Sequence, residues 1–309
     1  MLKKQKKIGQ KKLTRRKRMT QFGPMKTINS QYRRVPLSLT RFINQCNDYI
    51  DHLSLFHQYC LFRYTVSSAT INLYLISHEM HHVTTWANVF FTYWYNTNTT
   101  NALVPDDFKL FIPFLLHPHT YNALSTPKQE MVAMQIIKKY IVTVQQLILN
   151  GPAVRGKGFD VFKMSIKYDA LYDIKTLPTT VKQLPFNSTS TNMYYNFILF
   201  STLKSTCCLF RIKIPAGAHV LWLSSRLSAY PFEREVITPY DCLFDIKHIK
   251  QRVLNYIHPM DMNIVKVQHH NVKMGNVYRF DEKKPCKQSA CKIQSKWFTV
   301  YDCEYHNPD

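Results

Sequence analysis

The chain has 309 residues, of which 45% are hydrophobic and 14% aromatic, and its formal net charge is +22. This length and apolar content exclude a wholly disordered chain and leave room for one large domain or two small ones. The charge is unevenly spread, because residues 3–18 hold ten lysines and arginines and no acidic residue. So dense a run of one sign predicts a disordered basic tail over residues 1–35 that binds nucleic acid or another anionic partner, or targets the chain to the nucleus.

Other features of the sequence indicate the cellular compartment in which the protein is expected. The N-terminal charges are not followed by an apolar core, so no secretory signal is predicted, and no apolar run has the length of a membrane span. The eight cysteines are scattered without the spacing of a disulfide framework, which predicts reduced thiols. We therefore expect an intracellular protein, cytoplasmic or nuclear, and a basic tail of this kind is also compatible with carriage in a virus particle.

The first half of the chain reads as helical. Apolar residues between Leu37 and His82 follow the three-and-four spacing of an amphipathic helix. The same spacing recurs from Lys128 to Leu149, where Met131 and Met134 are placed on the apolar face, and Gly151 ends the pattern. Residues 83–125 predict an insertion or a helix with loops, so we expect residues 36–150 to form a helical part.

Short β-rich runs separated by turn residues follow. They predict strands at Val161–Met164, 194–203, 207–214, 220–223 and 235–238, and possible edge strands at 265–270 and 277–280. Such a series is typical of a mostly antiparallel, split sheet. The expected fold class is α+β, with a β core over residues 151–255 and a C-terminal extension over residues 256–309.

Two of the chain's six glutamates lie close together, at Glu233 and Glu235. Val236 and Ile237 predict a strand that begins at this pair, and side chains two apart on a strand share a face, so Arg234 would point to the other side. Paired carboxylates suit chemistry at the anomeric carbon of a sugar, where positive charge develops as a leaving group departs.

A zinc site is the competing interpretation. The segment from His78 to His82 satisfies His-Glu-x-x-His, which on a helix places two imidazoles one turn apart. No third ligand follows at a suitable distance, and the spacing of Cys286, Cys291 and Cys303 is not a standard one. We therefore expect a polar helix surface at His78 and no metal.

Four segments occur in an order that resembles one protein family. They are the helical signature Tyr64–Leu75, the strand Phe186–Ser190 with its Ser-Thr-Ser, the strand and Pro-x-Gly turn 210–217, and Tyr230-x-x-Glu233-x-Glu235. Together they resemble the mono-ADP-ribosyltransferases of the bacterial-exotoxin type over roughly residues 45–250. The resemblance implies a domain over residues 36–255, with N-terminal helices packed on a split, mostly antiparallel β core.

The resemblance also implies a reaction. The substrate would be NAD, and ADP-ribose would pass to a protein acceptor, on arginine, through an oxocarbenium-like transition state. Glu235 would stabilise the developing cation and Ser188 would hold Glu235 in position. Thr189 and Ser190 would help to shape the pocket for nicotinamide and ribose. Glu233 would act with Glu235 towards the acceptor, and Tyr230 would contact the protein substrate.

In the family, a cation binds the phosphates of NAD, and two residues of this chain could supply it. Members carry an arginine on the first strand, and Lys163 occupies the corresponding place, whereas Arg155 keeps the Arg-Gly pair but lies in a Gly-rich turn. Lysine supplies charge without the planar, two-pronged donor of arginine, and we favour Lys163. The substitution also motivates the alternative reading, an inactive relative that serves as a basic nucleic-acid-binding or structural protein.

Overall fold

A computed structural model describes eleven stretches of the chain. They are residues 37–78, 83–97, 104–165, 180–183, 185–191, 208–223, 227–229, 234–257, 264–268, 276–280 and 293–308. The basic tail lies outside them, and so does the strand expected at 194–203. The chain divides into two compact units, Met1–Val35 and Pro36–Asp309, and the elements below all belong to the second.

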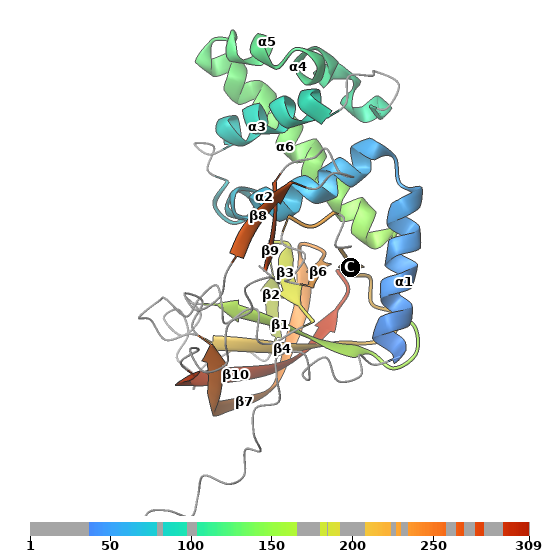
Figure 1. Cartoon of the computed structure of the whole chain (residues 1–309), viewed down its shortest axis with the longest axis vertical. Coiled ribbons are helices and arrows are strands. Elements are labelled where there is room, and N and C mark those ends of the chain that lie inside the picture. Colours follow the sequence, from blue (N-terminus) through green and yellow to red (C-terminus); the bar gives the residue numbers. More distant parts are fainter. Residues whose placement is uncertain are drawn as a thin grey trace, which may run out of the picture. The chain divides into compact units, whose positions relative to one another are not determined.

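Helices occupy the first half of this unit, as expected (Figure 1). The helices are α1 (Leu37–His52), α2 (Leu55–Ser77), α3 (Val83–Thr97), the 3-10 helix η3 (Asp106–Phe111), α4 (Ile112–Leu116), α5 (Pro118–Asn122) and α6 (Thr126–Leu149). Ser54 caps α2, because its hydroxyl accepts a hydrogen bond from the amide of His57 at 3.2 Å. The segment predicted as an insertion or a helix with loops is thus a series of helices from α3 to α5.

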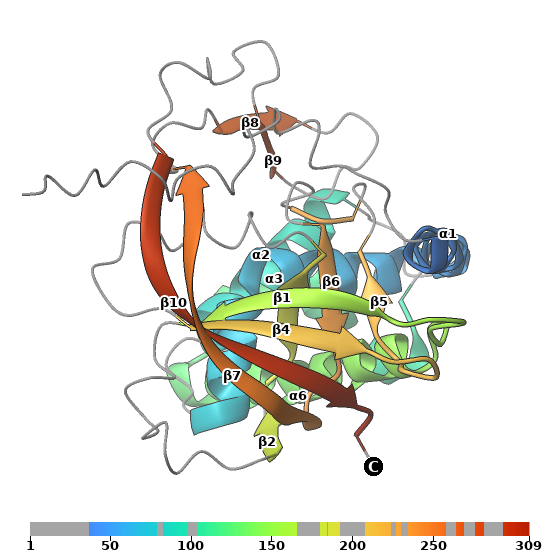
Figure 2. The same cartoon turned by 90° about the horizontal axis from the view of Figure 1, so that it is seen from below.

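Strands form the second half. The strands are β1 (Phe159–Ser165), β2 (Thr180–Gln183), β3 (Asn187–Ser190), β4 (Cys208–Ile214), β5 (Leu221–Trp222), β6 (Glu235–Thr238), β7 (Cys242–Ile257), β8 (Ile264–Gln268), β9 (Asn276–Phe280) and β10 (Ile293–His306). Eight of them make one sheet in the order β2-β7-β10-β4-β1-β3-β6-β5 (Figure 2). Within it β10 and β4 are parallel and the other neighbours antiparallel. The expected α+β class with a mostly antiparallel sheet is confirmed.

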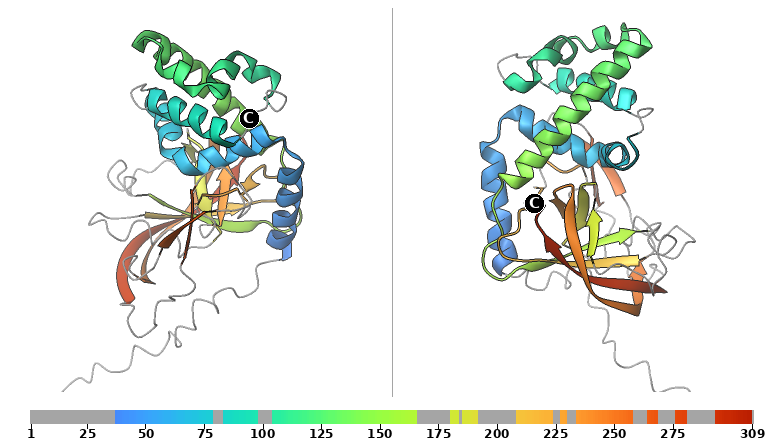
Figure 3. Two further views of the ribbon diagram at one scale, coloured as in Figure 1. Left: turned by 45° about the horizontal axis from the view of Figure 1, so that its top comes forward. Right: turned by 180° about the vertical axis from the view of Figure 1, so that it is seen from behind.

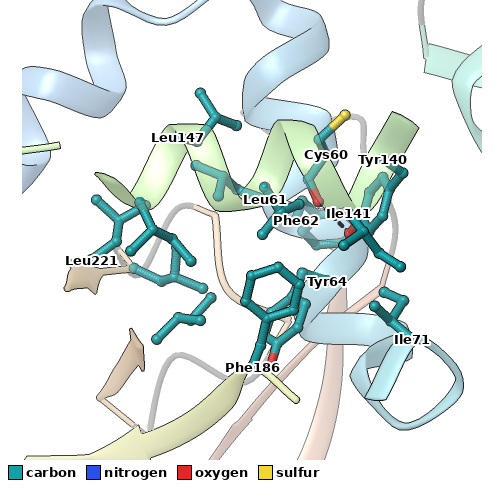
Figure 4. Packing of buried hydrophobic residues seen from close by; sticks show 14 of the residues in the cluster. Cys60, Leu61, Phe62, Tyr64, Ile71, Tyr140, Ile141, Leu147, Phe186 and Leu221 are labelled. Carbon is teal, nitrogen blue, oxygen red and sulfur yellow. Dashed lines mark hydrogen bonds between the residues drawn. The ribbon is translucent and has the colours of Figure 1, made fainter. Parts of the chain in front are cut away.

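Aromatic side chains join the helices to the sheet. The ring of Phe42 on α1 lies 5.3 Å from that of Phe159 on β1, and the ring of Tyr64 on α2 lies 5.5 Å from that of Phe186, which directly precedes β3 (Figure 4). The hydroxyl of Tyr140 on α6 donates to the carbonyl of Cys60 at 2.8 Å. Because these side chains are buried, α1 and α2 are fixed against the strands that carry the candidate site, and α6 is fixed against α2.

The C-terminal segment differs from the sequence prediction. We expected an extension with edge strands at most, but β10 lies inside the sheet between β7 and β4, pairing with β7 over fourteen residues. The runs predicted as edge strands, β8 and β9, pair with each other in a separate two-stranded sheet. Burial explains the central position, because Val300, Tyr301, Cys303 and Tyr305 are all buried.

Helix α6, with 24 residues, is the longest of the described helices (Figure 3). Met131 and Met134, predicted on its apolar face, are exposed by 54% and 38%, whereas Val132 and Ile136 are buried instead. In the described part of the chain it alone has the length and hydropathy of a membrane span, and half of that stretch is buried. A core helix has the same features, and α6 contacts both α2 and α3.

Candidate active site

The candidate site is built on a row of side chains that crosses four adjacent strands. Glu235 on β6 is paired with Ser190 on β3, Ser190 with Phe162 on β1, and Phe162 with Arg211 on β4. Directly paired residues project from the same side of a sheet, so these four share one face, here called the Glu235 face. Ser188 belongs to the same face because it lies two residues from Ser190 on β3.

Glu235 is the central acid of this face. It is 4% exposed, and its carboxylate accepts a hydrogen bond from the hydroxyl of Ser188. Burial raises the pKa of the Glu235 carboxyl from 4.5 to about 7, and the Ser188 hydrogen bond acts in the opposite direction by favouring the ionised form. A carboxyl with these properties changes its charge near neutral pH, which is a feature of groups that stabilise transient charge.

Helix α2 brings Tyr64 close to Glu235 and Asn72 close to Tyr64. The Tyr64 side chain is close enough for the carboxylate to raise its pKa further, although burial is the larger cause, and Asn72 lies beside Tyr64. The hydroxyl of Tyr64 and Oδ1 of Asn72 are both buried without a well-formed hydrogen bond to any described residue. Buried polar atoms are normally paired, so this corner suits the hydroxyl groups of a bound sugar.

The described strand begins at Glu235, the second member of the glutamate pair. Strand β6 begins at Glu235, and Arg234 has a left-handed backbone with φ 48°, so strand alternation does not extend back to Glu233. The carbonyl of Arg234 accepts a hydrogen bond from the amide of Thr191 at 3.2 Å. The expected common face of Glu233 and Glu235 therefore does not follow from β6, and Glu233 and Tyr230 lie outside the described residues.

The chain immediately before Tyr230 and Glu233 is anchored to α2. The amide of Ala229 donates to the hydroxyl of Thr65 on α2 at 2.9 Å, and both groups are buried. Thr65 adjoins Tyr64, so one turn of α2 contacts Glu235 and also fixes the chain just before the loop. The sequence indicated this helical signature but no role for Thr65, because the hydrogen bond joins residues 164 positions apart.

Lys163 does not lie with these groups. It is adjacent to Phe162 on β1 and projects from the opposite face, where its ammonium donates a hydrogen bond to Oδ1 of Asn187. Burial lowers the pKa of Lys163 to about 8, and the nearby Cys242 thiol acts in the opposite direction. The sheet therefore separates the side chains of Lys163 and Glu235, and the expected contact of Lys163 with the phosphates of NAD stays a prediction that this arrangement does not favour.

Thr189 is on that opposite face as well. Its hydroxyl donates to the carbonyl of Val236 at 2.6 Å and is buried, so it joins β3 to β6 from the side away from Glu235. Ser188 and Ser190 are the members of the Ser-Thr-Ser run that reach the Glu235 face. The rival cation, Arg155, is exposed in the turn between α6 and β1 and contacts none of these groups in the described structure.

Arg211 is a cation that the sequence patterns did not reveal. It occupies the Glu235 face, and its Nε lies 2.9 Å from Oδ1 of Asp302 on β10. No local signal singles the residue out, because its position depends on how β4 and β1 are paired, which the sequence alone does not state.

Helix α2 does not extend through the first residue of the zinc motif. It ends at Ser77, and His78 has a left-handed backbone with φ 56°. The rest of the motif, residues 79–82, lies outside the described structure. Among the described residues, no group of three or more histidine, cysteine or acidic side chains could hold a metal ion.

Comparison with known proteins gave structural likeness only. No family model matches the chain, and no curated protein matches its sequence. Among solved structures, the chain is similar to C3stau2 from S. aureus with NAD, at 11% identity and a TM-score of 0.47, covering 89% of this chain and 97% of that one.

Two further solved structures have a similar level of likeness. Plx2a, an ADP-ribosyltransferase toxin from Paenibacillus larvae, is 11% identical with a TM-score of 0.43, and the coverage is 87% of this chain and 95% of the toxin. The enzymatic component C2-I of the C2-toxin from Clostridium botulinum is 14% identical with a TM-score of 0.43; 85% of this chain is covered, but only 46% of C2-I. Since each TM-score is below 0.5, function has to be argued from the residues of the site.

Proposed function

We propose that the chain is an NAD-dependent mono-ADP-ribosyltransferase that modifies a protein, on arginine. The observation that supports this most is the buried Glu235 carboxylate, held by Ser188 and lying beside Ser190 and Tyr64. An acid in this setting suits a reaction in which positive charge develops on a ribose. The order of the four sequence motifs supports the same proposal independently of the geometry.

The proposed role of Glu235 follows from its environment. When nicotinamide leaves, the ribose carries positive charge, and an ionised carboxylate beside it stabilises that charge more than it stabilises the neutral ground state. Ser188 favours the ionised form of Glu235 and fixes its orientation. Tyr64 and Asn72 offer the ribose hydroxyls hydrogen-bonding groups that the described residues leave unsatisfied.

The proposed acceptor is an arginine side chain of a protein. This assignment rests on Glu233, whose position in the motif is a glutamate in arginine-modifying members of the family that the sequence resembles. Tyr230, in the same loop, would contact the acceptor protein. Thr65 supports this arrangement indirectly, because it anchors Ala229 immediately before the loop.

The proposal is tested by nicotinamide release from NAD labelled in the nicotinamide ring, with the purified full chain. We expect turnover by the wild type and a loss of about a hundredfold or more in Glu235→Gln, the order that removal of one preorganised stabilising group costs. Glu130→Gln, which changes an exposed glutamate on α6, is the matched control and should retain full activity. Equal turnover in both variants would refute the assignment of Glu235.

Transfer is tested separately with a small guanidinium compound as acceptor. Wild-type chain should form the ADP-ribosylated guanidinium, and Glu233→Gln should lose this product while still releasing nicotinamide. Loss of both reactions in Glu233→Gln would contradict a role limited to the acceptor. If the wild type released no nicotinamide and did not bind NAD, the alternative of an inactive, basic binding protein would hold instead.

A further inference from the structure

Helix α2 has a kink at Ser67. This residue has a non-helical backbone, with φ −134° and ψ 26°, although the helix continues on both sides of it. Helix α2 contains neither proline nor glycine, and in such a helix a sharp kink is expected where serines are paired or where a side chain interrupts the backbone hydrogen bonds. Tyr64 lies before the kink, and Ile71 and Asn72 lie after it (Figure 4).

The kink determines which groups of α2 can meet. In a straight helix, residues eight positions apart are separated by about 12 Å along the axis, and side chains lean towards the N-terminus. The side chain of Tyr64 would then point away from Asn72. In the structure, Asn72 lies close enough to the Tyr64 hydroxyl to act on its pKa, in the direction opposite to the larger effect of burial. The kink therefore allows both residues to lie near the Glu235 carboxylate.

Arg63 contacts the residue at the kink. Its Nη2 donates a hydrogen bond to the hydroxyl of Ser67 at 3.0 Å, and its guanidinium lies over the ring of Tyr93 on α3, 5.0 Å from the ring centroid. Arg63 is 1% exposed, and its Nε has no hydrogen-bond partner. Within the described residues, Arg63 forms no ion pair with an acidic side chain.

The burial of Arg63 makes its contact with Ser67 important. A buried charge is costly unless other groups compensate for the lost hydration, and a hydrogen bond from a charged donor is stronger than one between neutral groups. The hydroxyl of Ser67 and the ring of Tyr93 supply that compensation here. A change in the backbone of Ser67 that moved its hydroxyl away would leave the guanidinium without its side-chain acceptor.

We propose that Arg63 and Ser67 are positioning residues of the candidate active site, because their contact holds the kink in α2. The kink in turn places Asn72 beside Tyr64, where both can bind the ribose that Glu235 acts on. The inference rests on the proposed function for the reaction that it affects. Arg63 does not have to touch NAD in this role, since it is buried against α3 and acts through Ser67.

The kinetic test measures kcat and KM for nicotinamide release by the purified full chain. Ser67→Ala should lower kcat/KM for NAD by about tenfold or more, because a small displacement of a group that contacts the substrate has effects of this size. Ser67→Thr keeps the hydroxyl and should retain most of the activity. Ser68→Ala is the matched control: this neighbouring serine is half-buried, and its hydroxyl makes no hydrogen bond in the described structure. Equal kcat/KM in Ser67→Ala and Ser68→Ala would overturn the inference.

A double variant separates positioning from stability. Ser67→Ala leaves the buried Arg63 without its acceptor, so it should also destabilise the chain. Arg63→Met/Ser67→Ala removes both partners and replaces the cation with an apolar chain, so stability in urea unfolding should recover. The value of kcat/KM should stay low, because nothing then holds the kink. If activity recovered together with stability, the contact would be important for folding only.

A second cycle tests whether Ser67 acts through Asn72. In an Asn72→Ala background, the group that the kink positions is already absent, so Ser67→Ala should lower kcat/KM by much less than it does in the wild type. Independent, additive losses from the two substitutions would contradict this route.

The kink itself can be measured without any activity. Nitroxide labels are introduced as a non-natural amino acid at Leu55 and Ile76, which are both exposed and lie on opposite sides of the kink. A straight helix would separate these positions by about 32 Å, so we expect a shorter distance in the otherwise wild-type chain and a longer or broader distribution in Arg63→Met/Ser67→Ala. Identical distributions would overturn the inference and leave the transferase proposal standing. The expected change in distance, in a wild type that releases no nicotinamide, would refute the transferase proposal alone.

Discussion

Glu235 illustrates how one buried side chain links the site to pH. Its carboxyl pKa is raised by burial to about 7, so the folded chain binds this proton more tightly than the unfolded chain does. Between pH 4.5 and 7 the unfolded chain has released the proton and the folded chain has kept it. The free energy of unfolding should therefore fall as pH rises through this window.

A pair of measurements tests this at the residue scale. We expect the wild type to lose on the order of 3 kcal/mol of stability relative to Glu235→Gln between about pH 4.5 and 7.5, measured by urea unfolding. Nicotinamide release should increase through about pH 7, because the ionised carboxylate is the form that stabilises a cation. If the free energies of unfolding of the wild type and Glu235→Gln changed in parallel with pH, the raised pKa of Glu235 would be contradicted. If nicotinamide release did not change with pH, the need for an ionised Glu235 would be contradicted.

At the scale of single elements, β3 shows what the sequence could predict and what it could not. The run from Asn187 to Ser190 was recognised as a strand and Ser188 was linked to Glu235. The sequence could not show which of the residues Ser188, Thr189 and Ser190 share a face with Glu235. That depends on how β3 is paired with β6. Ser188 and Ser190 lie on the Glu235 face, whereas Thr189 bonds to Val236 on the other.

Substitutions of the neighbouring residues Ser188 and Thr189 should therefore affect different properties, the first catalysis and the second stability. Ser188→Ala removes the hydrogen bond that favours ionised Glu235, so we expect slower nicotinamide release and an activity profile displaced to higher pH. Thr189→Val removes a buried hydrogen bond to a backbone carbonyl and should cost about 1 kcal/mol of stability, with unchanged kinetics for NAD. A higher apparent pKa in both variants would mean that the two faces of β3 are not separated as described.

The same division between local and long-range information applies to the other elements. Strands β4 and β6 and the start of α2 follow from local patterns of apolar, turn and capping residues. The central place of β10 does not, although the run Trp297–Tyr301 has strong β propensity, because the sequence does not reveal which strand it will join. For the same reason the choice between Lys163 and Arg155 could rest only on local motifs: the strand that carries Lys163 was recognisable, whereas the pairing that decides which face Lys163 occupies was not.

At the scale of the whole molecule, the chain combines a folded body with a basic tail of different chemistry. Residues 3–18 of the tail contain nearly half of the excess positive charge, and the groups of the candidate site all belong to the unit Pro36–Asp309. No group in residues 1–20 is required for the proposed reaction. Nucleic-acid binding and NAD turnover should therefore be separable by deletion.

Deletion of residues 1–20 is the direct test. We expect the wild type to bind duplex DNA or RNA without sequence preference and with strong salt dependence, because each lysine or arginine that neutralises a phosphate releases counterions. The deletion should weaken binding at about 50 mM salt and flatten the plot of log K against log salt, by about one unit of slope for each phosphate that the tail no longer neutralises. Nicotinamide release should be unchanged, because Glu235 and Ser188 remain.

A variant that replaces the ten basic residues of 3–18 with glutamine separates the effect of charge from that of chain length. It should behave as the deletion does, because the affinity of such a tail for nucleic acid comes from neutralised phosphates and released counterions. Retained, salt-dependent binding in both variants would locate the nucleic-acid site on the folded body and contradict the role assigned to the tail.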